Sequence, residues 1–379
     1  MVKFLHTSDW QLGMTRAYLT PEAQVRYTDD QISGIRSLAE VASVHDCQFV
    51  VVAGDVFDSI QPDRRIVSRF LDALESFKVP VYLLPGNHDA NSPAAFWSTS
   101  DILEKLPSLV TLIRDSEPIR VPNTQAEIIG APWPSRKPDE DLIAKAIAQA
   151  GTPEAEVYRI VIGHGIVDSL APDQSDLAVI SLSEMQSAIR DGKVSYIALG
   201  DRHSYTRLGD SGAIYYSGAP LATDFREIDP NKALIVELTG GTPLVEPVEV
   251  GRWRFIAENF DLSDQHGVLL IQEFLDSLAN KDRTVVKLGI VGTLSLSVYS
   301  VLNSVLDGAS DLFASVDRSD SKSELVVLAD DKDLSDLDLS GFAREAANEL
   351  ARVSSANSEQ SAIAKDALML LNRLVRRQK

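Results

Sequence analysis

The sequence predicts a layered α/β domain, a smaller α+β module after it, and a helical segment at the end of the chain. Short β-rich runs alternate with helical patterns from residue 1 to about residue 250, and several of these runs are apolar throughout. Strand and helix patterns then resume in a shorter series near Trp253. Runs without polar alternation are typical of strands buried on both faces of a sheet. Strands that alternate with helices are typical of layered α/β domains.

The first part, residues 1–250, contains six expected strands. Between them, residues Asp29 to Val44 and Arg65 to Phe77 have the apolar spacing of amphipathic helices. The strands are the runs VKFLH, FVVVAG, VPVYLLPG, EIIGAPW, YRIVIGHG and YIALGDRH.

The second part, residues 251–330, reads as a small module with alternating elements. The expected order is the strand RWRFIAENF, a helix from Val268 to Leu278, the strand TVVKLGIVG, a helix from Leu296 to Leu306, and the strand SELVVLA. The third part, residues 331–379, is an acidic linker, DDKDLSDLDLSG, followed by a helical segment from Phe342 to Arg377. Its apolar stripe is suited to docking on its own domain or on a partner.

Composition excludes several classes of protein. No run approaches 18 uninterrupted apolar residues, so no membrane span is expected. The beginning of the chain lacks the basic and apolar regions of a secretory signal, and the single cysteine, Cys47, allows no disulfide framework. These features predict a cytoplasmic location. The net charge of −19 argues against a protein that coats nucleic acid by itself, because phosphate binding needs clustered Lys and Arg.

Polar residues follow five of the expected strands in the same way. Each strand stops at or near Gly and then presents Asp, Asn or His, at Asp9, Asp55 and Asp58, Asn87 and His88, His164, and Asp201 and His203. In α/β sheets, ligands and catalytic groups gather beyond the carboxyl ends of the strands. The chain is therefore expected to bring acids, an amide and imidazoles to one edge of the sheet.

Carboxylate, amide oxygen and imidazole together are ligands for divalent transition metals. Two such ions can clamp a phosphate and generate a hydroxide nucleophile near neutral pH. Asp55 is the best candidate for a carboxylate shared by both ions. The alternative is local turn chemistry, because Gly-Asp and Gly-Asn are frequent turn pairs. Any one motif favours that alternative, but five in succession on strand ends favour a metal site.

The order of these motifs resembles that of the calcineurin-like metallophosphoesterase superfamily. The stretches LHTSDWQLG, VVAGDVFD, LPGNHD and YYSGAPLATDFRE further resemble the bacterial SbcD-type subunit of a DNA-repair nuclease, over residues 1 to about 230. The resemblance implies a layered calcineurin-like metallophosphoesterase sandwich in the first part. It also implies a capping domain in the second part, where the similarity is one of pattern.

The resemblance also implies roles for particular residues. His88 would protonate the leaving oxygen or stabilise the transition state, Asp58 would orient His88, and Asn87 would help to position the phosphate. The first metal would be held by Asp9, residue 11, Asp55 and His203, and the second by Asp55, Asn87, His164 and residue 201.

Two positions depart from the family pattern, which has His at both. This chain has Gln11 and Asp201, so an oxygen ligand replaces a nitrogen ligand in each set. The change predicts two divalent ions of the harder type, Mn²⁺ first and Mg²⁺ as the alternative, over Zn²⁺. The other outcome is a poorly filled first site, and then a sluggish enzyme or a catalytically weak scaffold subunit.

The implied function is that of a Mn²⁺-dependent phosphodiesterase, a DNA repair exonuclease subunit that cleaves backbone phosphodiesters with a hydroxide activated by two metal ions. The implied partners are DNA and an SbcC-like ATPase, and the helices that follow Asp29 and Arg65 are candidate surfaces for a homodimer. The alternative is a small-molecule phosphodiesterase or phosphatase. Five arginines are candidates for phosphate contacts or for ordinary surface charge, namely Arg16, Arg26, Arg64, Arg65 and Arg136.

Overall fold

The computed structural model describes residues 1–93, 95–173, 176–262, 264–319, 322–328, 339 and 341–354, with scattered positions between 360 and 371. Two compact units are present. One comprises Met1–Ala17 and Gln24–Trp253, and the other comprises Tyr18–Ala23 and Arg254–Lys379. Most of the predicted linker and much of the predicted final helical segment lie outside the described residues. The division into three domains therefore stays a prediction.

The first unit contains two six-stranded sheets, in which parallel strands form the centre. In the first sheet, β1 to β4 pair in parallel, and the two remaining strands are antiparallel additions beside β1. Its order is β12 (Leu244–Glu249), β11 (Lys232–Leu238), β1 (Val2–Thr7), β2 (Phe49–Ala53), β3 (Val81–Leu84) and β4 (Val110–Leu112).

The second sheet repeats this plan with different connectivity. Its four central strands are parallel and its two edge strands are antiparallel. The order is β5 (Ile119–Arg120), β6 (Ala126–Gly130), β7 (Tyr158–His164), β8 (Tyr196–Gly200), β10 (Ile214–Tyr216) and β9 (Thr206–Leu208). Strands β2, β6 and β8 are buried along their whole length, as their apolar runs predict.

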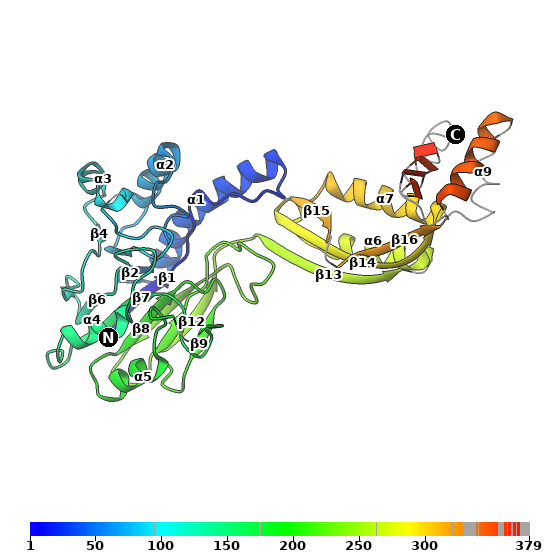
Figure 1. Cartoon of the computed structure of the whole chain (residues 1–379). Coiled ribbons are helices and arrows are strands. Elements are labelled where there is room, and N and C mark those ends of the chain that lie inside the picture. Colours follow the sequence, from blue (N-terminus) through cyan, green and yellow to red (C-terminus); the bar gives the residue numbers. More distant parts are fainter. Residues whose placement is uncertain are drawn as a thin grey trace. The chain divides into compact units, whose positions relative to one another are not determined.

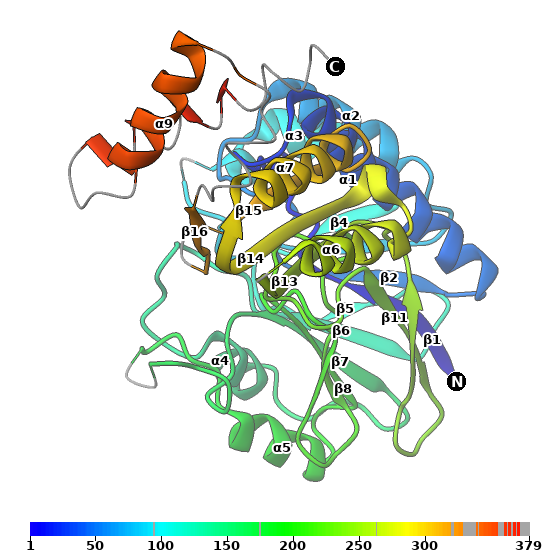
Figure 2. The same ribbon diagram turned by 90° about the vertical axis from the view of Figure 1, so that its right-hand side faces the viewer.

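The two sheets face each other across one apolar core and carry helices on their outer faces. Side chains from both sheets, among them Phe4, Phe49, Ile160 and Tyr196, fill the space between the sheets. A second core lies under α1 (Pro21–Val44) and α2 (Arg64–Leu74), and a third under α4 (Leu142–Gln149) and α5 (Leu182–Arg190). Figures 1 and 2 show these helices against their sheets. The first unit is thus the predicted layered α/β sandwich.

The helices begin where capping chemistry allows. Helix α1 starts at Pro21, well before the predicted Asp29, and proline is favoured in the first turn because its missing N–H would be unpaired there. The Asp63 side chain accepts a hydrogen bond from the Arg65 N–H and caps α2. Two short helical elements complete the unit, the 3₁₀ turn η1 (Phe96–Ser98) and α3 (Ser100–Lys105).

The second unit is a small layer of strands with two helices on it. Strand β14 (Thr284–Ser295) pairs in parallel with β13 (Arg254–Leu262) on one side and with β15 (Ser315–Arg318) and β16 (Glu324–Leu328) on the other. Helices α6 (Gln265–Ser277) and α7 (Leu296–Ser310) cover its apolar core (Figure 1). A 3₁₀ turn, η2 (Lys281–Arg283), and helix α9 (Phe342–Ser354) are the other described elements. Both predicted helices are therefore present, and all strand pairs in this layer are parallel.

Among the residues that the structure describes, no helix has the length and apolar character needed to span a membrane.

Candidate metal centre

The carboxyl ends of five strands deliver the predicted ligands to one edge of the sandwich. Asp9 follows β1, Asp55 follows β2, and Asn87 follows β3 in the first sheet, while His164 ends β7 and Asp201 follows β8 in the second. Backbone hydrogen bonds tie the first two loops together, from the Asp9 N–H to the Gly54 carbonyl and from the Gln11 N–H to the Asp55 carbonyl, both at 3.0 Å. The edge of the sheets is therefore held rigidly.

Four of the predicted ligands have backbone in the left-handed region. The φ angles are 54° at Asp9, 50° at Gln11, 53° at Asp55 and 100° at Asp201. Non-glycine residues rarely adopt positive φ, and such strained residues cluster at functional sites. The strain shows that the surrounding structure fixes where these side chains point.

The second predicted ligand set converges on the imidazole of His164. Its Nε2 lies 3.0 Å from Asn87 Oδ1, 3.3 Å from Asp55 Oδ1 and 3.8 Å from Asp201 Oδ1. Asp9, Asp55 and His164 are all buried and offer ligand atoms within 4.8 Å of one another. Sequence reasoning placed these residues at one site, and the structure brings them together.

The first predicted set is assembled around Asp9 and Gln11. His203 Nε2 lies 3.8 Å from Asp9 Oδ1, and the Gln11 side-chain N–H donates to Asp55 Oδ2 at 2.8 Å. The Gln11 Oε1 atom is buried and has no hydrogen-bond partner among the residues that the structure describes. A buried acceptor without a partner costs about 1–3 kcal/mol, and a cation bound among these carboxylates would satisfy it. The residues present therefore fit a metal ion here, which Gln11 would help to hold.

Buried negative charge is the second observation that fits metal ions. Asp9 and Asp55 are 1% and 2% exposed, and their ion-pair partners among the described residues are histidines. Burial raises the pKa of Asp9 to about 6, with a further contribution from the charge of Asp55. Carboxylates held together in this way repel one another unless a cation lies between them.

Both imidazoles are oriented through their other ring nitrogen. His164 Nδ1 lies 2.9 Å from the Ala53 carbonyl oxygen, and His203 Nδ1 lies 3.0 Å from Glu227 Oε1 and 2.7 Å from Thr223 Oγ1. In each case the Nε2 atom is left facing the carboxylates. A hydrogen bond at Nδ1 fixes the tautomer in which Nε2 can ligate a metal.

Two glycines that precede proposed ligands lie so close to other ligand side chains that no side chain would fit at their positions. A Cβ atom at Gly54 would lie 2.2 Å from His164 Nδ1, and one at Gly86 would lie 2.2 Å from Asp55 Oδ1. Glycine is therefore required in the Gly-Asp and Gly-Asn pairs that first indicated the site, because the ligand side chains approach the glycine backbone too closely for a Cβ atom.

Asp89 is a buried residue of the site that sequence reasoning assigned no role. Its carboxylate accepts hydrogen bonds from the Gly86 N–H at 2.7 Å, the Phe57 N–H at 3.2 Å and Trp97 Nε1 at 3.1 Å. It thereby joins the loop after β2 to the loop after β3. Asp89 is the last residue of the GNHD motif, and its place in that motif was the sequence signal that could have indicated its role.

His88 lies beside the ligands and not among them. Its side chain is 45% exposed, and its Nδ1 atom lies 3.4 Å from Asp58 Oδ1 and 3.3 Å from the Asp58 carbonyl oxygen. The hydrogen bond to Asp58 raises the pKa of His88 to about 9 against the opposing effect of burial. The predicted pairing of Asp58 with His88 is thus present, and Nε2 is the ring nitrogen left for a substrate.

A cavity of about 470 Å³ opens over these residues. His88, Asp201 and His203 line it, together with Arg16, Arg202 and Arg226. Arg26, Arg64, Arg65 and Arg136 are not among the described residues that line this cavity. Of the five arginines that the sequence offered, the structure therefore places only Arg16 here, and it adds two that sequence reasoning missed.

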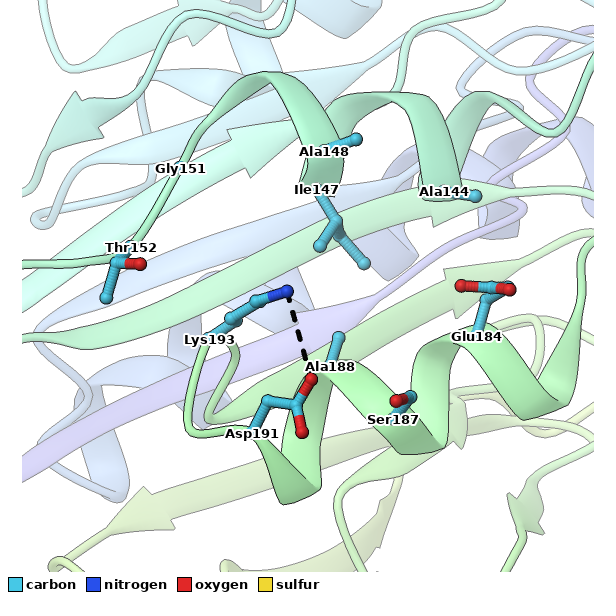
Figure 3. A pocket seen from close by; sticks show the side chains of 10 residues that line it. All are labelled: Ala144, Ile147, Ala148, Gly151, Thr152, Glu184, Ser187, Ala188, Asp191 and Lys193. Carbon is cyan, nitrogen blue, oxygen red and sulfur yellow. Dashed lines mark ion pairs between the residues drawn. The ribbon is translucent and has the colours of Figure 1, made fainter.

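A second cavity, of about 330 Å³, lies between α4 and α5 (Figure 3). Small side chains such as Ala144, Ala148 and Ala188 line much of it, and Lys193 pairs with Asp191 at 3.8 Å (Figure 3). None of the predicted site residues lines this cavity. The chemistry of the chain is therefore expected at the first cavity.

The metal-free protein should unfold at a lower temperature at pH 9 than at pH 6. Burial raises the pKa of Asp9 to about 6 and that of Asp89 to about 7. Burial lowers the pKa of His203, but the hydrogen bond to Glu227 and the negative charges of Glu227 and Asp9 raise it more, so this pKa is about 9. The pKa of His88 is also raised to about 9. A group with a raised pKa stabilises the fold at low pH and loses that contribution as the pH passes the folded-state value.

We expect the melting temperature without metal to fall on the order of 5 °C between pH 6 and pH 9. Added Mn²⁺ should raise it more at pH 9, because metal ligands must be deprotonated. Differential scanning calorimetry at both pH values, with chelator and with Mn²⁺, tests this. A metal-free protein that melts at an equal or higher temperature at pH 9 would contradict the prediction.

A model of the calcineurin-like phosphoesterase family matches residues 2–236. The chain belongs to this family. The predicted family and fold class are thereby confirmed, and the family is one of metal-dependent phosphoesterases with a dinuclear divalent metal site. The candidate ligand cluster of this calcineurin-like phosphoesterase lies within the matched residues.

Three curated relatives are nucleases or repair proteins by name. The chain is 26% identical to the SbcD subunit of the nuclease SbcCD of Escherichia coli (strain K12) over 266 residues, which are 61% of this chain and 63% of that protein. It is 24% identical to the protein of the same name from Rhodobacter capsulatus over 297 residues, 66% of this chain and 71% of that protein. It is 30% identical to the DNA double-strand break repair protein Mre11 of Archaeoglobus fulgidus over 128 residues, 33% of this chain and 27% of that protein. The match thus spans less than two thirds of the Escherichia coli relative.

Proposed function

We propose that this chain is a nuclease subunit that hydrolyses DNA phosphodiesters with two divalent metal ions. The observation that carries the proposal is the convergence of two ligand sets that share Asp55, directly beside a cavity lined by His88 and three arginines. The names of the relatives, the SbcD subunit of SbcCD and Mre11, support DNA as the substrate.

Each residue has a distinct task in this proposal. One metal ion would be held by Asp9, Gln11, Asp55 and His203, and the other by Asp55, Asn87, His164 and Asp201. When bound, the ions supply Lewis acidity and a nucleophile at neutral pH. His88, protonated through its contact with Asp58, donates the Nε2 proton to the departing sugar oxygen.

The metal preferred by this site is Mn²⁺, with Mg²⁺ as the alternative. Gln11 and Asp201 replace the two imidazoles of the family pattern with oxygen ligands, and Asp201 adds a third carboxylate to Asp9 and Asp55. Hard oxygen ligands favour Mg²⁺ and Mn²⁺, whereas imidazole suits Zn²⁺. Turnover in Mn²⁺ at least about tenfold faster than in Zn²⁺ would agree with this assignment.

The arginines of the cavity are suited to the DNA backbone. Arg16 is held by a hydrogen bond from its Nε to the Thr223 carbonyl at 2.9 Å, and Arg202 by one from its Nε to Thr206 Oγ1 at 2.8 Å. Guanidinium groups bind phosphate through paired N–H donors. Because the whole chain carries a net charge of −19, we propose that further DNA affinity comes from an SbcC-like ATPase partner.

A second candidate is the same chemistry on a small phosphate ester or cyclic nucleotide. The size of the cavity, about 470 Å³, favours it, because pockets of this size hold small ligands. The metal ligands are the same in both cases, so the substrate has to be tested directly.

Hydrolysis of end-labelled linear duplex DNA in Mn²⁺ tests the proposal, with a small model phosphodiester assayed in parallel. Asp191→Asn, in the second cavity, is the matched control and should keep wild-type rates. DNA cleavage that chelator abolishes supports the nuclease. Cleavage of the small diester alone favours the second candidate, and inactivity on both substrates in the presence of bound Mn²⁺ favours a scaffold subunit.

A further inference from the structure

The two imidazoles of the metal centre have different partners at Nδ1. His164 contacts a neutral group, the Ala53 backbone carbonyl at 2.9 Å. His203 contacts the Thr223 hydroxyl at 2.7 Å and a carboxylate, Glu227 Oε1, at 3.0 Å, and the Glu227 side chain is only 6% exposed. A buried carboxylate at Nδ1 raises the basicity of a metal-ligating imidazole more than a neutral carbonyl does.

Glu227 is held in place independently of any metal. Its Oε2 accepts a hydrogen bond from the Thr223 N–H at 2.8 Å, and its Oε1 accepts one from the Thr223 hydroxyl. The neighbouring residue, Ala222, is fixed from two further sides, because its carbonyl accepts from the Tyr27 hydroxyl and its N–H donates to Asn231 Oδ1. The carboxylate is therefore a preorganised partner for His203.

His203, the imidazole that contacts Glu227, belongs to the ligand set that contains Gln11. Gln11 contributes a neutral amide oxygen where the family pattern has an imidazole, so this set depends on His203 as its one imidazole. The other set keeps His164 with a neutral partner, but it gains a carboxylate, Asp201, at its altered position. One altered set thus has a carboxylate, Asp201, at its altered position, and the other has a carboxylate, Glu227, behind its imidazole.

We propose that Glu227 is a positioning residue that compensates for Gln11. Its carboxylate fixes His203 with Nε2 free toward Asp9 and strengthens His203 as a ligand, so that the set with the weak amide ligand still binds its ion. The inference rests on the metal sites of the proposed function and not on the identity of the substrate.

Metal binding by the full chain, measured by calorimetry in the absence of DNA, tests this inference. Glu227→Gln should weaken one of two Mn²⁺ binding events by about 10–100-fold and leave the other within about threefold of wild type. Asp229→Asn is the matched control, an acid two residues away that pairs with Lys232 at the surface. It should change neither event.

A second substitution separates compensation from a role in holding the loop. Adding Gln11→His to Glu227→Gln should recover at least about tenfold of the lost affinity, because the set regains an imidazole that does not need Glu227. Equal weakening of both events, an unchanged affinity in Glu227→Gln, or no recovery in the double variant would each overturn the inference. Should Glu227→Gln not fold, Thr223→Val removes the hydroxyl that contacts both the Glu227 carboxylate and His203 Nδ1, and it should weaken the same single event.

The binding measurement also keeps this inference separate from the nuclease proposal. Wild-type protein that binds two Mn²⁺ ions but does not cleave DNA would overturn the proposed substrate and leave the pairing of Glu227 with Gln11 testable. A wild-type chain that binds fewer than two ions would overturn the inference itself.

Discussion

Replacing Asp55 with asparagine should reduce phosphodiester hydrolysis by at least about 10³-fold. Asp55 is the only proposed ligand that both sets share. Its Oδ1 lies 3.3 Å from His164 Nε2 and its Oδ2 accepts from the Gln11 amide at 2.8 Å, so the two oxygens face opposite sets. Asparagine keeps one acceptor oxygen and removes the charge. Metal ions contribute several kcal/mol to the transition state, and each 1.36 kcal/mol is tenfold in rate.

The variant should also hold fewer than two ions, and metal analysis after gel filtration measures this directly. Asp191→Asn provides the control for purification and handling. Two bound ions together with a rate within about tenfold of wild type would show that Asp55 is not the shared ligand.

The strands of the site could be predicted because a strand buried on both faces has a continuous apolar run in its own sequence. Strands β2, β6 and β8 are buried on both faces, so their runs contain no alternation and end abruptly at a glycine. The start of α1 was missed by eight residues, because its first turns bury only Ala23 and Tyr27 among their apolar residues while Val25 is exposed, and Pro21 is the clearest mark of the beginning.

The pairing of the strands could not be predicted, because it depends on contacts between distant parts of the chain. Strand β1 lies between β2 and β11, and β11 begins at Lys232, more than two hundred residues later. The short strands β5, β9 and β10 have two or three residues each, too few to show a period. The second sheet was therefore recognised by its long strands alone.

The same distinction applies to the metal centre. Residues on strand ends were found from local patterns, but Glu227 contacts a histidine 24 positions away and lies on none of the described strands. The stretch YYSGAPLATDFRE contains both Thr223 and Glu227, yet nothing in its pattern indicates that they meet His203. The place of Arg202 in the cavity could not be predicted for a similar reason. Arg202 lies between two proposed ligands in the sequence, and the turn after β8 determines where its side chain points.

Removing the imidazole of His88 should lower kcat by about 10²–10⁴-fold while both metal ions remain bound. The His88 side chain belongs to neither ligand set, and the contact of His88 with Asp55 is made by its backbone N–H at 3.0 Å, which His88→Ala retains. The loss should be larger for a diester with an alkyl leaving group than for one with a nitrophenyl leaving group, because only the poor leaving group needs a proton. Steady-state kinetics on both diesters, with metal analysis of each sample, measures the difference.

The pH profile provides a second test of the same role. The hydrogen bond to Asp58 raises the pKa of His88, which favours the protonated imidazole at neutral pH, and the proton donor is then lost as the pH rises further. The alkaline fall in kcat should therefore disappear in His88→Ala. It should move to lower pH in Asp58→Asn, because the neutral amide no longer stabilises the imidazolium. Equal losses on both diesters, with an unchanged alkaline limb, would assign His88 to phosphate binding instead of proton donation.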